Sequence, residues 1–278
     1  MIAIVAVIML LASVALATDS GQGNRGQCGS GSGLQVIGLT TDQQLVCFRS
    51  DQPNRAAVIA PVTGLSGDTA LVGIDFRPAD GQLYGVGNAG GLYTIDPRSA
   101  VATKFNQLSV ALSGVSFGVD VNPAADALRV ISDAGQNLRF SFSAGTTTVD
   151  GTLNYPGTVP VATGVVGAAY TNNDSDTNTA TTLFDIDSML DQVVTQTPAN
   201  SGQLSPTGKL GVDTDTRVGF DIHSKIRNGT TVSNTGLAAL NVGGVSTLYS
   251  VDPLIGRAGR IGTFNYSIEG IAIVLAQT

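Results

Sequence analysis

A glycine-centred motif recurs along the chain about every fifty residues, and this repeat limits the possible fold more than any other feature. LVGIDFRP at residues 71–78 is echoed by SFGVDVNP, VVGAAYTN, RVGFDIHS and IEGIAIVL. The steps between the aligned glycines are 45, 49, 52 and 51 residues: Gly73, Gly118, Gly167, Gly219 and Gly270. A second echo, GLYTIDP at residues 91–97, returns as TLFDIDS and TLYSVDP, with NLRFSFS as its degenerate copy. A period of about fifty residues, with four short strands in each copy, is typical of β-propeller blades.

The fifth copy of the repeat is incomplete, because the chain ends shortly after IEGIAIVL. Three strand-like runs near the start match the missing strands: GLQVIGLT (33–40), QLVCFRSDQP (44–53) and AAVIAPV (56–62). We therefore predict an all-β, five-bladed propeller in which the C-terminal strand completes the blade begun near Leu34. This closure leaves few exposed sheet edges. An irregular β-sandwich is the alternative.

Two zones precede the predicted propeller, which covers residues 34–278. Residues 1–17 are apolar and uncharged, and residues 18–33 read as a Gly/Ser linker. The first zone is either a retained assembly segment or a signal peptide. Ala15-Leu16-Ala17 fits a cleavage site, but no basic residue precedes the apolar core. If the segment is retained, it can pack into a filament or add a strand to a neighbour, and the residues expected to make these contacts are Ile2, Ile4, Val5, Val7, Ile8, Leu10 and Leu11.

The composition excludes several classes of protein. Hydrophobic residues make up 42% of the chain, enough for a sizeable core, and charged residues make up only 13%. A net charge of −7 argues against a nucleic-acid partner. Cys28 and Cys47 allow one disulfide, which either pins the linker to the first blade or joins two subunits in an oxidising exterior. Together with His223, they are too few and too scattered for a zinc site.

The series GIDFRPADGQLYGVG, LYTIDP, FGVDVNPAADALRVISDAGQNLR, VDGTLNY and GAAYTNN resembles a family of secreted bacterial and archaeal proteins catalogued as a domain of unknown function. The resemblance covers nearly all of residues 34–278 and implies propeller-like repeats and an extracytoplasmic location. It implies no activity and no catalytic residues. Residues 1–17 are similar to archaeal type IV pilins in lacking charge, and they depart from the bacterial pattern, which has Glu where this chain has Val5.

Three acids occupy the same position in different copies of the repeat. Asp75, Asp120 and Asp221 each follow the motif glycine by two residues, where the other copies have Ala169 and Ala272. The first strand of a propeller blade lines the central channel, so these carboxylates are expected to gather in one ring. Either each accepts backbone hydrogen bonds from a neighbouring blade, or together they hold a metal or a small cationic ligand.

A polar loop offers a second group of candidate ligands. Asp174, Asp176 and Asn178 alternate in TNNDSDTNTATT, the way a short loop presents oxygens to Ca²⁺. The glycine and distant glutamate of an EF-hand loop are missing, so a solvated insertion explains the loop equally well. Ca²⁺ is thus the one candidate cofactor. The tripeptides that fit N-glycosylation begin at Asn173, Asn228 and Asn265.

Two catalytic motifs match only by chance. GVGNAG (85–90) satisfies a dinucleotide-binding pattern but precedes a strand, so it reads as a hairpin turn. GVSFG (114–118) satisfies the nucleophile-elbow pattern, yet Ser116 opens a repeat strand and its partner would have to be His223. His223 lies just before Asn228-Gly229, a favoured hairpin dipeptide, and reads as a loop residue.

These observations favour a non-catalytic, extracellular structural protein that self-assembles into a pilus-like or other surface filament, with the propeller as its head. Contact with a membrane, through residues 1–17, is expected to be transient. The alternatives are a secreted or anchored propeller that binds a ligand or glycan, and a carboxylate- or Ca²⁺-dependent hydrolase or lyase.

Overall fold

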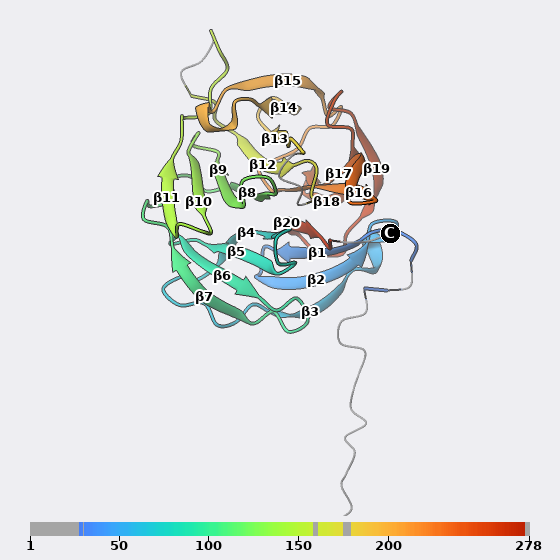
Figure 1. Ribbon diagram of the computed structural model, residues 1–278. Coiled ribbons are helices and arrows are strands. Elements are labelled where there is room, and N and C mark those ends of the chain that lie inside the picture. Colours follow the sequence, from blue (N-terminus) through green and yellow to red (C-terminus); the bar gives the residue numbers. More distant parts are fainter. Residues whose placement is uncertain (1–27, 30, 158–160, 175–178, 276–278) are drawn as a thin grey trace, which may run out of the picture.

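Five four-stranded antiparallel sheets surround a central axis in the computed structural model (Figure 1). The structure describes residues 28–29, 31–157, 161–174 and 179–275. The predicted all-β, five-bladed propeller is confirmed. Helical structure in these ranges consists of two short 3-10 turns, η1 (Pro53–Arg55) and η2 (Ala199–Ser201). Neither turn approaches the length and apolar character that a membrane-spanning helix requires.

The blades are numbered along the chain, and their strands are given from the axis outward. Blade 1 contains β4 (Leu71–Phe76), β5 (Leu83–Gly87), β6 (Gly91–Ile95) and β7 (Ala102–Gln107). Blade 2 contains β8 (Phe117–Asn122), β9 (Ala127–Ser132), β10 (Asn137–Ser141) and β11 (Thr146–Val149). Blade 3 contains β12 (Val165–Tyr170), β13 (Leu183–Asp187), β14 (Gln192–Gln196) and β15 (Leu204–Lys209). Blade 4 contains β16 (Val218–Arg227), β17 (Thr230–Val242), β18 (Val245–Val251) and β19 (Ala258–Thr263).

Blade 5 closes the ring with strands from both ends of the chain. Its inner strand is β20 (Ile268–Ile273), followed outward by β1 (Gln35–Thr40), β2 (Gln44–Arg49) and β3 (Ala57–Pro61). β20 pairs with β1 antiparallel, with Val36 opposite Ile273. A disulfide between Cys28 and Cys47 ties the segment before β1 to β2 within one chain. The closure predicted from the incomplete fifth repeat is therefore present.

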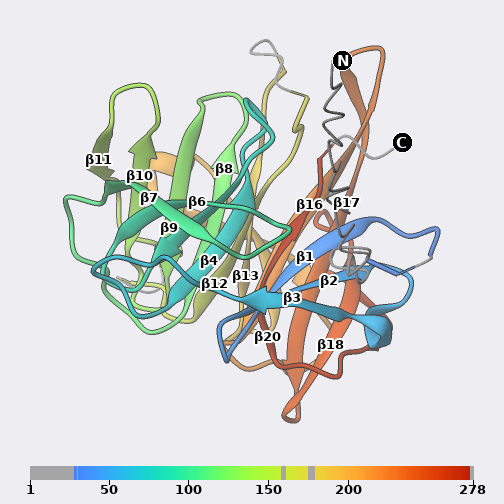
Figure 2. The same cartoon turned by 90° about the horizontal axis from the view of Figure 1, so that it is seen from below.

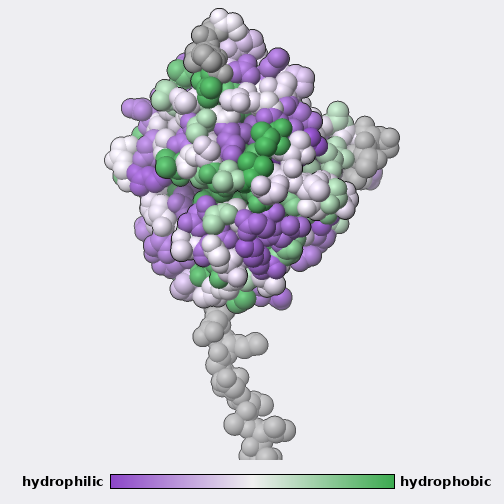
Figure 3. Space-filling model, turned by 90° about the vertical axis from the view of Figure 1, so that its left-hand side faces the viewer, coloured by the Kyte–Doolittle hydropathy of each residue, from purple (hydrophilic) through white to green (hydrophobic). Residues whose placement is uncertain are grey.

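The core lies between the blades. Each of the five interfaces between neighbouring blades contains one cluster of buried apolar side chains. The inner strands are buried on both faces, whereas outer strands such as β7 alternate between buried and exposed residues. β7 and β11 lie on the left of Figure 1, and Figure 3 shows this side as mostly polar with small apolar patches. Phe105 and Val149 are exposed large apolar residues of these two strands.

The copies of the second sequence echo do not all form the same strand of their blades. GLYTIDP, NLRFSFS and TLYSVDP form the third strands β6, β10 and β18. TLFDIDS instead forms β13, the second strand of blade 3, which pairs with both β12 and β14. A strand that is buried on both faces selects the same residue types whether it is second or third from the axis.

Blade 4 carries a hairpin that projects from the disc (Figure 2). β16 and β17 pair continuously from Val218–Leu240 to Arg227–Thr230. The turn is Asn228-Gly229, and both residues have positive φ, 51° and 80°, as a tight hairpin turn requires. As predicted, GVGNAG (85–90) also forms a hairpin turn: it spans the end of β5 and the turn into β6.

Candidate ligand sites on the axis and between the blades

The three acids that recur with the repeat meet on the propeller axis. Asp75, Asp120 and Asp221 lie on the inner strands β4, β8 and β16, all nearly fully buried. One carboxylate oxygen from each lies within 4.8 Å of the other two. We call this group the acid layer.

Each acid of this layer binds the next blade. An inner strand has one edge without a strand partner, so its inward N–H groups need other acceptors. The carboxylates accept three of them across blade boundaries: Val121 N donates to Asp75 Oδ2 (2.8 Å), Tyr170 N to Asp120 Oδ1 (3.0 Å), and Ile273 N to Asp221 Oδ2 (2.5 Å). The interblade role considered in the sequence analysis matches this geometry.

The equivalent N–H groups of blades 4 and 1 come after blades 3 and 5, whose inner strands have alanine in place of the acid. Ala169 and Ala272 offer no acceptor to the next blade. The N–H of Ile222 donates to Asp221 of its own strand (2.5 Å), and that of Phe76 donates to Asp75. Three carboxylates thus accept five equivalent inner-edge N–H groups, which is why three acids suffice for five blades.

The three carboxyl groups of the acid layer all have raised pKa values. Burial, and then the charge of Asp221, raise the pKa of Asp75 well above its usual value. Burial, and then the charge of Asp75, do the same to the pKa of Asp120. Burial also raises the pKa of Asp221 to about 6, against the effect of its two backbone donors. Oxygens at this spacing suit a hard cation, but a cation would compete with the backbone donors for the same carboxylates.

A cavity of about 270 Å³ opens on the axis where the inner strands begin. We call it the mouth cavity. Beyond it, at the level of the motif glycines, the space on the axis has a volume of only about 10 Å³. Glu269 lies in both linings, and burial raises its pKa to about 7. No sequence motif singled out Glu269, although it is the only glutamate in the chain.

Gln43 positions Glu269 from the turn between β1 and β2. Gln43 has a left-handed backbone, with φ of 60°. Its amide bridges both backbone groups of Leu71, accepting from N (2.6 Å) and donating to O (3.1 Å). The same Nε2 donates to Glu269 Oε1 (3.0 Å). Segments 226 positions apart in the chain therefore build this side of the cavity.

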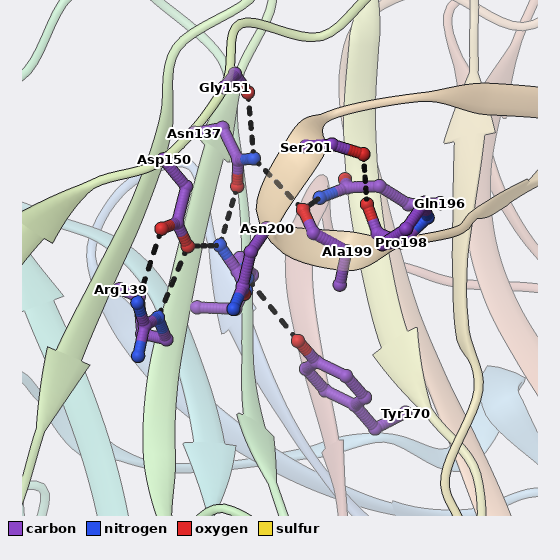
Figure 4. Close-up of polar contacts among 11 residues, drawn as sticks. Asn137, Arg139, Asp150, Gly151, Tyr170, Gln196, Pro198, Ala199, Asn200 and Ser201 are labelled. Carbon is purple, nitrogen blue, oxygen red and sulfur yellow. Dashed lines mark hydrogen bonds and ion pairs between the residues drawn. The ribbon is translucent and has the colours of Figure 1, made fainter.

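A buried arginine joins blades 2 and 3. Arg129, on β9, is 2% exposed. At this interface Figure 4 shows Asn137 and Asp150 of blade 2 facing Asn200 and Tyr170 of blade 3. Its guanidinium donates to Asp150 Oδ2 (2.6 Å), Asn137 Oδ1 (2.7 Å), Asn200 Oδ1 (2.8 Å) and Tyr170 Oη (3.2 Å). Since every nitrogen of the guanidinium has a partner, the group holds the interface and is not open to a ligand.

Asp185 is buried near this arginine without a hydrogen bond. The residue is 0% exposed, and neither of its carboxylate oxygens has a partner. Burial raises its pKa well above the usual value, and the charge of Arg129 opposes the rise only in part. Thr94 and Ser250 occupy the aligned positions in the other echoes. This departure from the pattern is the sequence signal that could have identified Asp185.

A cleft of about 600 Å³ separates blades 3 and 4 where the inner strands end. Phe184 and Val251 form a buried apolar floor, and Leu254 (73% exposed) and Ile255 (58% exposed) belong to its rim. The polar residues of the lining include Thr171, Asn234, Thr235, Ser250, Asp252 and Arg257. We call this the interblade cleft.

The other predicted site residues do not gather in one place. Asp174 binds the hairpin, and its Oδ2 accepts from Thr231 N (3.1 Å) and Oγ1 (2.9 Å). Asp176 and Asn178 lie outside the described residues, as do the proposed assembly residues in 1–17, so the calcium loop and the assembly segment stay predictions. Asn173, Asn228 and Asn265 lie in loops or turns, and nothing in the structure bears on their glycosylation.

Ser116 lies just before β8, whereas His223 lies within β16, so the expectation that His223 is a loop residue was wrong. Ser116 lines the mouth cavity, whereas His223 lines a small cavity of about 20 Å³ beside the hairpin. Position 116 is level with Arg217 in the repeat, six residues before His223. At about 3.3 Å per residue the separation is roughly 20 Å, too far for a nucleophile and its base.

Comparison with known proteins supports the fold. The model of the family described as Domain of unknown function (DUF4394) matches residues 44–272. Among curated proteins, none matches the chain. A chain from a nidogen/laminin complex is 11% identical with a TM-score of 0.52, over 88% of this chain and 100% of that one. A Bacteroides thetaiotaomicron protein of unknown function is 15% identical with a TM-score of 0.50, over 90% of this chain and 67% of that one. At these identities the likeness concerns the fold alone.

Proposed function

We propose that this chain, which belongs to the family described as Domain of unknown function (DUF4394), is an extracytoplasmic binding module. In this proposal the propeller is a rigid frame and the interblade cleft holds a small amphipathic ligand. The observation that carries the proposal is the cleft itself, with its volume of about 600 Å³. Ligand pockets in proteins have volumes of about 300–1,000 Å³ and combine an apolar lining with a few polar groups.

The lining of the interblade cleft matches an amphipathic ligand. The floor is apolar, and the exposed Leu254 and Ile255 at the rim would lose contact with water when a ligand binds. Ser250 and Thr235 supply hydroxyl groups within the lining. Arg257 supplies a positive charge, and none of the ion pairs among the described residues includes it. These groups favour a ligand that carries an acidic or carbonyl oxygen.

Hydrogen bonds join blades 3 and 4 beside the cleft. Asn234 Nδ2 donates to Asn172 Oδ1 (3.0 Å), which ties the base of the hairpin to the loop after β12. Thr231 binds Asp174 of the same loop. A preformed cavity avoids the entropic cost of ordering its walls when the ligand binds.

The extracytoplasmic location and the filament role rest on the sequence. A disulfide between Cys28 and Cys47 is compatible with an oxidising compartment. Residues 1–17, as a retained segment, would anchor or assemble the propeller head. The intact mass of the native protein tests this part: a mature chain that begins at Thr18 rules the assembly segment out.

Filling the cleft tests the binding function. Thr235→Trp places a bulky ring in the interblade cleft, and Thr103→Trp places one in a groove of about 470 Å³ on blade 1. Both threonines are exposed strand residues. We expect wild type and Thr103→Trp to retain small molecules from an extract of the native medium, detected by mass spectrometry, and Thr235→Trp to lose them. Equal retention by all three proteins, or none by wild type, would refute the proposal.

A further inference from the structure

Glu269 breaks the pattern of the propeller axis. The residue before the motif glycine is apolar in the other four blades: Val72, Phe117, Val166 and Val218. In blade 5 it is Glu269, the only glutamate of the chain. Glu269 is partly buried, and placing a carboxyl group where the fold accepts valine has a desolvation cost. Departures from a structural pattern of this kind are typical of functional sites.

The mouth cavity around Glu269 has the walls of a small binding site. Val72, Phe117 and Val218 contribute apolar surface, and Val115 stands at the cavity with 85% of its surface exposed. The space beyond, at the motif glycines, has a volume of only about 10 Å³. A ligand that enters therefore stops at the level of Glu269. An aromatic ring beside a carboxylate and aliphatic side chains suits an organic cation.

The nearest cation does not neutralise Glu269 directly. Arg217 lies in the cavity lining, but its Nη2 and Nε donate to Asp215 Oδ2 at 2.6 and 3.1 Å. None of the ion pairs among the described residues includes Glu269. Asp42, on the turn that carries Gln43, adds negative charge nearby. Among the described residues, the carboxylate of Glu269 therefore accepts a hydrogen bond from Gln43 and forms no ion pair, and Arg217 acts on it only at longer range.

We propose that the mouth cavity binds a small aliphatic ammonium ion, with the Glu269 carboxylate as its counter-charge and Phe117 and the valines as its apolar wall. This site lies at the opposite end of the axis from the interblade cleft and does not depend on it. Burial raises the pKa of Glu269 to about 7, with Arg217 opposing the rise and Asp42 adding to it. Below that pH the proton competes with the ligand, so affinity should increase as the pH rises through about 7.

The single glutamate makes the test direct. Protein labelled with ¹³C-glutamate has one glutamate carboxyl signal, from Glu269. We expect n-butylammonium chloride at about pH 8 to shift this signal to saturation and to lower its titration midpoint. n-Butanol, which has the same chain without the charge, should do neither. No shift, or the same shift with n-butanol, overturns the proposal.

Two variants separate binding from folding. Glu269→Gln keeps an oxygen for Gln43 and removes the charge, so it should weaken n-butylammonium binding by at least about tenfold in calorimetry while the protein stays folded. Asp96→Asn removes one negative charge from a turn of blade 1 and should bind as wild type does. Unchanged affinity in Glu269→Gln, or equal losses in both variants, contradicts the role of Glu269.

Discussion

Asp150 and Asp185 both lie near the buried guanidinium of Arg129, but only Asp150 forms ion pairs. Asp150 accepts from Arg129 at 2.6 Å and from Arg139 at 3.2 Å, so its charge is fully compensated. Asp185 is fully buried and has no hydrogen bond, and its raised pKa means that the folded protein keeps it protonated over a wider pH range than the unfolded chain. A carboxyl group of this kind lowers stability as the pH rises, whereas Asp150 supports the interface.

Asp185→Asn is therefore expected to increase stability. At about pH 7.5 the gain should be about 1–3 kcal/mol, because the unfolded wild-type chain favours the ionised form that the folded site disfavours. The gain should shrink at about pH 4.5, where both states hold more protons. Urea unfolding at the two pH values measures this.

Asp150→Asn is the matched control for that measurement. It leaves Arg129 buried without its charged partner, and we expect a loss of about 3 kcal/mol or more. A loss for Asp185→Asn at both pH values would mean instead that Asp185 is ionised and supported by Arg129.

At the scale of the elements, the motif glycines differ in how closely their strands approach the next blade. A Cβ atom on Gly219 would lie 2.8 Å from the backbone of β20, and one on Gly118 would lie 2.8 Å from the backbone of β12. A Cβ atom on Gly270 would have its nearest neighbour, Leu39 Cβ, at 3.6 Å. A larger side chain would therefore clash with the next blade at Gly118 and Gly219, but not at Gly270 in blade 5.

This difference predicts contrasting effects within one motif. Gly219→Ala should lower the free energy of unfolding by about 2–3 kcal/mol, because β16 would have to move away from β20. Gly270→Ala should stay within about 0.5 kcal/mol of wild type. Thermal or urea unfolding of the two variants measures the contrast, and similar effects at both positions would show that the strands tolerate a shift.

For the whole molecule, proton binding by the axial acids links stability to pH. Asp221 and Glu269 have folded pKa values of about 6 and about 7, above their ordinary values of 3.8 and 4.5. Between the ordinary and the folded values these two groups bind more protons in the folded state than in the unfolded state, so their contribution to stability falls as the pH rises from about 4 to about 7. His223, with a lowered pKa, acts in the opposite direction as the pH falls.

We therefore expect the free energy of unfolding to fall by at least about 2 kcal/mol between about pH 5 and pH 8, measured by urea unfolding. Glu269→Gln should reduce the slope near pH 7. A stability that rises steadily with pH over this range would contradict the raised pKa values of Asp221 and Glu269.

Sequence alone determined the number of blades, the closure by the C-terminal strand and the recurrence of Asp75, Asp120 and Asp221, because each blade is a local unit whose pattern repeats along the chain. Tertiary structure decided where TLFDIDS lies, which N–H group each acid accepts, and that Gln43 meets Glu269. These contacts cross the axis or a blade boundary. They depend on how the sheets twist and how closely the inner strands approach one another, and distances of this kind have no period in the sequence.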